Sequence, residues 1–143
     1  MEFQNTITIN CPQQVLFNYL AQPEHVPEWN YAISKTEQIG EGKVGVGTKF
    51  RQFRTVPRPA EERFEVTEFE APTRFAIQGD LGPFNGTVRY ILRALSVRST
   101  ELTNEADLKV PLSLRLASPL LTHQVRSAVA ANLVVLKGIM ERA

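Results

Sequence analysis

The stretch SPLLTHQVRSAVAANLVVLKGIMERA, residues 118–143, decides the fold. Pro119 stands near its start, no proline follows and Gly138 is its only glycine, so a helix can run through it. At about 100° per residue the apolar side chains gather on one face. This face comprises Leu121, Val125, Ala128, Val129, Asn132, Leu136, Ile139 and Met140, opposite His123, Arg126, Ser127, Lys137 and Glu141. A long amphipathic helix of this kind has to lay its apolar face on another element.

The N-terminal residues predict a strand followed by two short helices. In residues 3–10 the side chains of Phe3, Asn5, Ile7 and Ile9 alternate with polar ones, as in a strand with one buried face. The spacing of Val15, Leu16, Tyr19 and Leu20 indicates a helix over residues 12–21. Pro23 ends this helix and opens a second short helical segment that reaches Trp29.

The middle of the chain reads as strands separated by turns that contain glycine and proline. Strands are predicted near residues 33–39, 47–55, 61–70, 74–79, 86–95 and 100–110. Consecutive strands joined by short turns pair antiparallel. The sequence therefore predicts one α+β domain over residues 1–143, with a curved antiparallel seven-stranded sheet wrapped around the C-terminal helix. A small molecule could sit in the space between the sheet and the helix.

Composition and charge exclude several classes of protein. The 16 basic and 15 acidic residues leave a net charge of +1, so neither nucleic acid nor an anionic membrane is expected as the main partner. No apolar run approaches the roughly 20 residues that span a bilayer, and MEFQNTITIN is unlike a signal peptide. Cys11 is the only cysteine, which fits a reducing cytoplasm. The sequence leaves a homodimer open.

Stretches spread over nearly the whole chain carry a resemblance to a known family. They are Ile7, Ile9 and Pro12; Val15-Leu16-Phe17; Pro23 to Trp29; Val44-Gly45-Val46-Gly47-Thr48; Val66, Phe69 and Pro72; and Asn132 to Lys137. Together they resemble the START-like (Bet v 1-like, SRPBCC) superfamily, and within it the bacterial polyketide cyclase/dehydrase group. The resemblance implies a helix-grip fold with a cavity for lipids, polyketides, hormones or aromatic compounds. It supplies no universal catalytic motif, so catalytic residues stay unknown.

The expected cavity has mostly apolar walls and a few polar positions. We expect it to be lined by Phe64, Val66, Phe75 and Ile77 from strands and by Val125, Val129 and Leu136 from the helix. Asn132 lies near the centre of the helix's apolar face, so its amide either bonds to the strands or orients a ligand. Asn104 and Tyr90 share the parity of the inward positions of their strands. These three residues are the candidate polar anchors.

The stretch HVPEWN, residues 25–30, and a basic strand supply the candidates for the cavity mouth. We expect Trp29 either to plug one end of the curled sheet or to contact a ligand, and His25 to reach the opening. A run of basic residues (Lys49, Arg51, Arg54 and Arg58) precedes a run of acids (Glu61, Glu62, Glu65, Glu68 and Glu70). This pattern favours cross-strand ion pairs on the solvent face. The alternative is an anion site at the mouth that uses Arg51 or Arg54.

Other chemistries find little support in the sequence. The glycines Gly40, Gly42 and Gly45 match G-x-G-x-x-G, but a strand follows them where a nucleotide-binding loop opens a helix. Only two histidines are present, far apart, which supports neither a metal site nor a Ser-His-Asp arrangement. Cys11 has no neighbouring base and reads as an inert thiol. We therefore expect no cofactor and no metal.

Three functions remain open on these observations. The favoured one is binding, transport or sequestration of a small hydrophobic ligand. The second is a polyketide cyclase or dehydratase, but the positions expected to face inward contain no carboxylate or histidine, which weighs against it. The third is a protein-interaction module, which would have a filled core and an exposed apolar patch.

Overall fold

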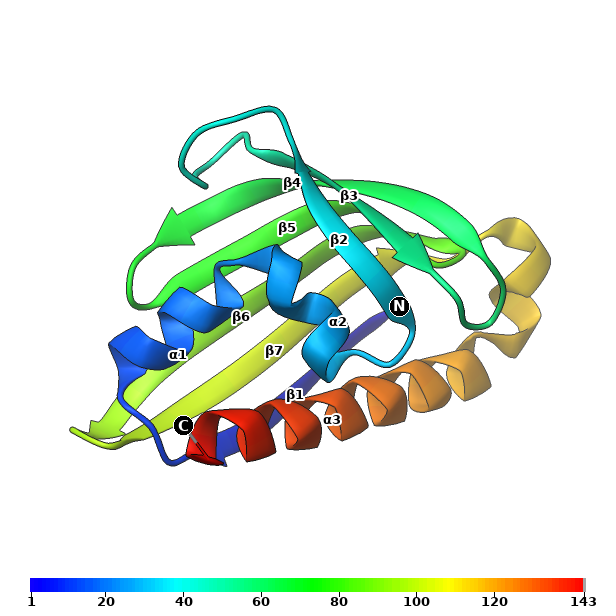
Figure 1. Cartoon of the computed structure of the whole chain (residues 1–143). Helices are drawn as coiled ribbons and strands as arrows, with labels where there is room; N and C mark the ends of the chain where they lie inside the picture. The colour runs from blue at the N-terminus through cyan, green and yellow to red at the C-terminus, as the bar shows by residue number, and fades with distance from the viewer. Residues whose placement is uncertain (143) are drawn as a thin grey trace.

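The computed structural model describes residues 1–142, in which seven antiparallel strands form one sheet of order β1-β7-β6-β5-β4-β3-β2 (Figure 1). The elements are β1 (Glu2–Ile9), α1 (Gln13–Leu20), η1 (Pro23–His25), α2 (Val26–Trp29), β2 (Ile33–Ile39), β3 (Lys49–Arg54), β4 (Ala60–Glu70), β5 (Arg74–Leu81), β6 (Phe84–Ser96), β7 (Ser99–Lys109), η2 (Leu112–Ala117) and α3 (Ser118–Arg142), where η marks a 3-10 helix. The predicted order of elements and the helix-grip architecture are confirmed. The one unpredicted element is η2, which precedes α3.

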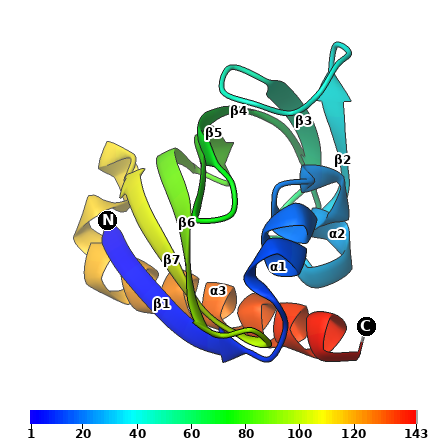
Figure 2. The same ribbon diagram turned by 90° about the vertical axis from the view of Figure 1, so that its left-hand side faces the viewer.

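The sheet curls because glycines let its central strands approach closely. Gly79 and Gly86 are partners across β5 and β6. A Cβ on Gly86 would overlap the carbonyl oxygen of Asp107 and lie 2.8 Å from the Cα of Leu108, and one on Gly79 would overlap the carbonyl oxygen of Arg63. Glycine inside a strand marks such tight bends. In Figure 2 β1, β7 and β6 form one wall of the curled sheet, and β2 and β3 form the wall opposite.

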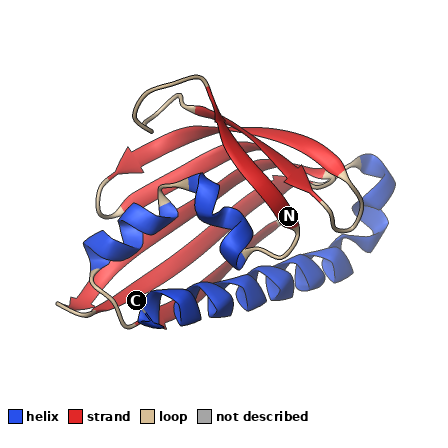
Figure 3. Ribbon diagram, viewed as in Figure 1, coloured by secondary structure: helices blue, strands red, loops and turns tan. Residues whose placement is uncertain are grey.

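Helices cover only the concave face of the sheet. Figure 3 shows α1, α2 and α3 on the same side of the strands. The long helix α3 follows the edge strand β1 and is tied to it by side chains. Lys137 donates to the carbonyl oxygen of Thr8 at 2.7 Å, and Asn5 donates to that of Arg126 at 3.3 Å. The predicted apolar face of α3 turns inward, and Leu133 joins it as a further buried residue.

The buried core joins the concave face to all three helices. Its members include Leu16, Phe17 and Leu20 of α1, Trp29 of α2, Phe50, Phe64, Val66 and Phe75 of the sheet, and Leu133, Leu136 and Met140 of α3.

The convex face instead carries ion pairs such as Arg89 with Glu68. Hydrogen bonds from Arg89 lower the pKa of Glu68. Among residues 1–142, no helix is both long and apolar enough to cross a bilayer.

Candidate functional site

The side chains that face the interior, between the concave face and α3, fall into two groups. Phe64, Val66, Phe75 and Leu136 are fully buried in the core. Ile77, Tyr90, Val125 and Val129 pack against core clusters and yet stay only half-buried. The predicted cavity residues are therefore brought together in one cluster, except Val125, which packs against a second cluster of Phe84, Ala106 and Leu108. The half-buried ones keep part of their surface accessible to solvent.

Two of the predicted polar anchors meet on neighbouring strands. Tyr90 of β6 and Asn104 of β7 are register partners, and Asn104 is 1% exposed. The Oδ1 atom of Asn104 is buried and has no hydrogen-bond partner in the described chain. Burial raises the pKa of Tyr90, and a hydrogen bond from Asn104 opposes this rise in part. The ring of Trp29 meets the Tyr90 ring edge-on, with centroids 6.3 Å apart.

The third predicted anchor, Asn132, projects from α3 into the same interior. It is 7% exposed, but its amide atoms are not enclosed without a partner as the Oδ1 atom of Asn104 is. Water or a ligand can therefore reach this amide. Tyr90, Asn104 and Asn132 are all neutral. The interior therefore offers uncharged hydrogen-bonding groups set in apolar walls.

A buried ionic cluster on the concave face escaped the sequence analysis. Glu62 is 3% exposed and accepts hydrogen bonds from Gln52 at 2.8 Å, from Nε of Arg54 at 2.7 Å and from the backbone N–H of Gly82 at 2.6 Å. The expectation that the acids of this strand all face solvent, with no carboxylate inward, is wrong. Glu62 shares the parity of Phe64 and Val66, the inward positions of β4, and this parity is the signal that could have located it.

The two arginines expected at the cavity mouth lie on opposite faces of β3. Arg54 belongs to the buried cluster with Glu62 and is mostly enclosed. Arg51 lies on the convex face, where it binds Glu37 at 2.7 Å and Glu61 at 3.4 Å. Arg51 is therefore part of the cross-strand ion pairing that the charge pattern favoured. Only Arg54 remains next to the interior.

The two residues singled out in HVPEWN have different surroundings. Trp29 is 6% exposed and packs in the core beside Tyr90, as expected for a plug. His25 stacks on Tyr19 with ring centroids 4.3 Å apart, and its ring nitrogens meet Glu28 at 2.6 Å and Gln22 at 2.9 Å. It lines an outer groove of about 330 Å³ between α1 and the end of α3. His25 therefore faces this groove rather than the polar anchors.

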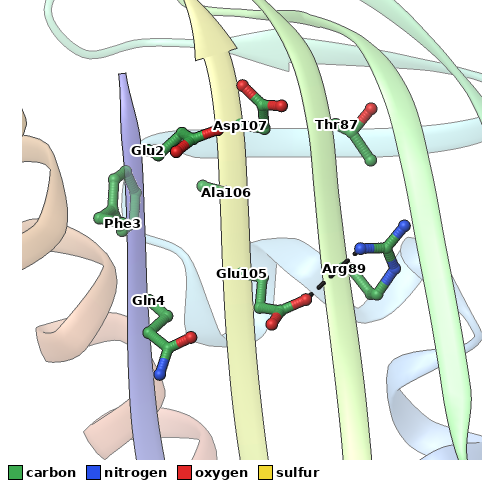
Figure 4. A pocket seen from close by; sticks show the side chains of 8 residues that line it. All are labelled: Glu2, Phe3, Gln4, Thr87, Arg89, Glu105, Ala106 and Asp107. Carbon is green, nitrogen blue, oxygen red and sulfur yellow. Dashed lines mark hydrogen bonds and ion pairs between the residues drawn. The ribbon is translucent and has the colours of Figure 1, made fainter.

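A second hollow, of about 490 Å³, lies on the convex face (Figure 4). Its lining includes Glu2 and Gln4 of β1, Arg89 of β6 and Glu105 of β7, and Figure 4 shows Arg89 and Glu105 paired across the strands. The lining is polar and carries three carboxylates, of Glu2, Glu105 and Asp107, against the one guanidinium of Arg89, unlike the predicted cavity. No group of three His, Cys, Asp or Glu side chains among residues 1–142 has the geometry to hold a metal ion.

The sequence model of one family, described as polyketide cyclase/dehydrase and lipid transport, matches residues 1–141. The chain belongs to this family. The polyketide cyclase/dehydrase and lipid transport family thus accounts for the resemblance found in the sequence, and for the fold that positions the interior. No curated protein matches the sequence significantly.

Solved structures share the fold of this family member at low sequence identity. An aromatase/cyclase, ZhuI, from Streptomyces sp. R1128 has a TM-score of 0.79 at 15% identity, covering 99% of this chain and 94% of its own. A conserved protein from Geobacillus kaustophilus has a TM-score of 0.81 at 14% identity, with 99% and 96% covered. A START superfamily protein from Mycobacterium smegmatis has a TM-score of 0.76 at 15% identity, with 99% and 97% covered.

The tyrosines predict a loss of stability in alkali. Burial, followed by the nearby charge of Glu28, raises the pKa of Tyr19 from 10.0 to about 12, and burial raises that of Tyr90 as well. Above pH 10.0 the unfolded chain loses tyrosine protons that the folded chain keeps, so the free energy of unfolding falls as the pH rises. Urea unfolding at about pH 9, 10 and 11 measures this slope. Tyr19→Phe should make it shallower, and an unchanged slope would contradict the assignment.

Proposed function

We propose that this chain binds a small, neutral, hydrophobic ligand that carries a hydroxyl group, in the interior between the sheet and α3. One observation carries the proposal: Asn104 is 1% exposed, and its carbonyl oxygen lacks a donor among the described residues. A hydroxyl group supplies the missing donor. The apolar walls contribute the driving force, at roughly 25 cal/mol per Å² of buried apolar surface.

The charges around the interior support a neutral ligand. Arg54 and Glu62 neutralise each other, and the remaining acceptor positions of the carboxylate are taken by Gln52 and Gly82. A carboxylate or phosphate placed beside Tyr90 and Asn104 would lose its hydration, and Arg54, already paired with Glu62, is the one cation assigned to the interior among residues 1–142. The proposed function is therefore storage or transfer of an uncharged aromatic or lipid-like compound in the cytoplasm, without a cofactor or nucleic acid.

A matched set of three naphthalenes tests the proposal. We expect 2-naphthol to bind at least about tenfold more tightly than 2-methoxynaphthalene, because only the naphthol can donate to Asn104. The anion 2-naphthoate should bind more weakly than either. Fluorescence titration measures the three affinities. Equal affinity for the naphthol and its methyl ether, or preference for the naphthoate, would contradict the proposal.

Asn104→Leu is the variant that isolates the anchor. It removes the carbonyl oxygen that lacks a donor, together with the hydrogen bond that Asn104 makes to Tyr90, so the two changes oppose each other and we expect the free energy of unfolding to change by no more than about 1.5 kcal/mol. The variant should bind the naphthol and its ether equally well. Asn85→Leu, the same change at an exposed position of β6, is the control and should keep the preference for the naphthol.

A polyketide cyclase or dehydratase is the second candidate function. The specific observation in its favour is the phenol of Tyr90, held between Asn104 and Trp29 where a proton donor could act on a bound carbonyl. Native mass spectrometry of the freshly purified protein should identify a co-purified compound. If that compound is converted, Tyr90→Phe should lower the rate of conversion with little effect on affinity; retention of the rate would restrict the protein to binding.

A further inference from the structure

The outer face of α3, turned away from the sheet, is exposed and almost free of charge. We define it by the exposed side chains within about 100° of arc: Leu120, Gln124, Ser127, Ala131, Val134, Val135 and, in the last turn, Arg142. Leu120 is 60% exposed and Val134 is 62% exposed. The preceding η2 extends this apolar surface with Leu112 and Leu116, which is 102% exposed. In Figure 1 η2 and the start of α3 project past the end of the sheet.

Up to Met140, the charges along this segment all have one sign. Residues 108–140 contain no aspartate or glutamate, whereas Lys109, Arg115, Arg126 and Lys137 are basic. On α3, Arg126 and Lys137 lie about 100–120° around the helix from Leu120, on the flank beyond His123 and Glu141. The net charge of +1 does not reveal that basic residues are concentrated in this segment. Most of the acidic residues lie on the sheet, where many pair with arginines.

We propose that η2 and the outer face of α3 dock the protein onto an anionic lipid bilayer. An exposed apolar helix face bordered by basic side chains is the pattern of helices that lie in the membrane interface. Leu112, Leu116 and Leu120 would enter the headgroup region, and Arg115 and Arg126 would contact lipid phosphates. The docking stands independently of the interior ligand, because none of these side chains belongs to the candidate anchors.

A second copy of the chain fits the outer face less well than a bilayer does. A symmetric pair would use the same patch twice and so bring basic side chains toward one another. The one carboxylate near this face, Glu141, is already held by Lys137 at 2.6 Å and by the backbone N–H of Asn10 at 2.7 Å. Anionic lipid phosphates would supply negative charge opposite the basic side chains and leave both hydrogen bonds of Glu141 in place.

Co-sedimentation with lipid vesicles tests the docking. We expect the full chain to bind phosphatidylcholine vesicles that contain phosphatidylglycerol and to bind pure phosphatidylcholine vesicles weakly. Added salt should weaken binding. Arg126→Gln should lower affinity about fivefold, and the double change Leu116→Gln with Leu120→Gln should lower it at least about tenfold. These positions are exposed, so circular dichroism should show an unchanged fold.

The control removes an equally exposed apolar side chain elsewhere. Val97, 86% exposed, lies in the turn between β6 and β7, and Val97→Gln should leave vesicle binding unchanged. Failure of the full chain to bind vesicles that contain phosphatidylglycerol would overturn the proposal. So would sedimentation of the free protein as a dimer that Val134→Glu converts to monomer, because the outer face would then be an interface between copies.

Discussion

Gly86→Ala is expected to lower the free energy of unfolding by about 3 kcal/mol or more. The added methyl group would overlap the backbone of β7 at Asp107 and Leu108, which belongs to the sheet and cannot rotate away as a side chain would. The pairing of β6 with β7 would have to loosen at this point. Urea or guanidinium unfolding followed by circular dichroism measures the change.

Gly45→Ala provides the matched control for this prediction. Gly45 lies in the connection between β2 and β3, its φ is not positive, and a Cβ there meets no atom within 4 Å. The same methyl group should therefore change stability by no more than about 0.5 kcal/mol. If both variants lost a comparable amount of stability, the close approach of β7 to Gly86 would not be the cause of the loss.

Glu62→Ala is expected to destabilise the fold by about 3–5 kcal/mol. The change removes the acceptor of three donors at once and leaves Arg54 and Gln52 enclosed without it. The cluster joins β3 and β4 to the turn after β5, so its loss should loosen the end of the sheet where these elements meet. Chemical denaturation measures the cost, and hydrogen exchange at the Gly82 amide locates it.

The neighbouring acid supplies the comparison. Glu61 is about half exposed and pairs with Arg51 on the convex face at 3.4 Å. Exposed pairs contribute at most about 1 kcal/mol, so Glu61→Ala should have a small effect. If both alanine variants lose the same stability, burial is not what gives the Glu62 cluster its importance.

Much of the fold follows from periodicity in the sequence. The alternation of apolar and polar residues in β1 and the apolar face of α3 are local patterns. Each arises because one side of the element is buried along its length. The 3-10 helix η2 escaped prediction because the alternating leucines of LSLRLA match no helical face. In the structure Leu112 and Leu116 face solvent, so no burial constrains the pattern.

The candidate site was predictable only where strand parity decides the outcome. Parity alone indicated that Tyr90 and Asn104 point inward. The Glu62 cluster depends on the register of β3 with β4 and on the position of the distant Gly82, which no local pattern contains. Whether His25 faces the interior or the outer groove is also not set by a local pattern, because the groove is formed in part by the C-terminal end of α3.

The strand order also bears on how the chain avoids aggregation. A sheet that does not close leaves two edges, β1 and β2, whose free backbone groups could pair with strands of other molecules. The long helix packs along β1. On β2 the register shifts between Ile33 and Lys35, and Lys35 and Glu37 place charges along the strand. An irregular, charged edge is a poor template for another strand, so the open curl that provides an interior need not make the protein prone to form fibrils.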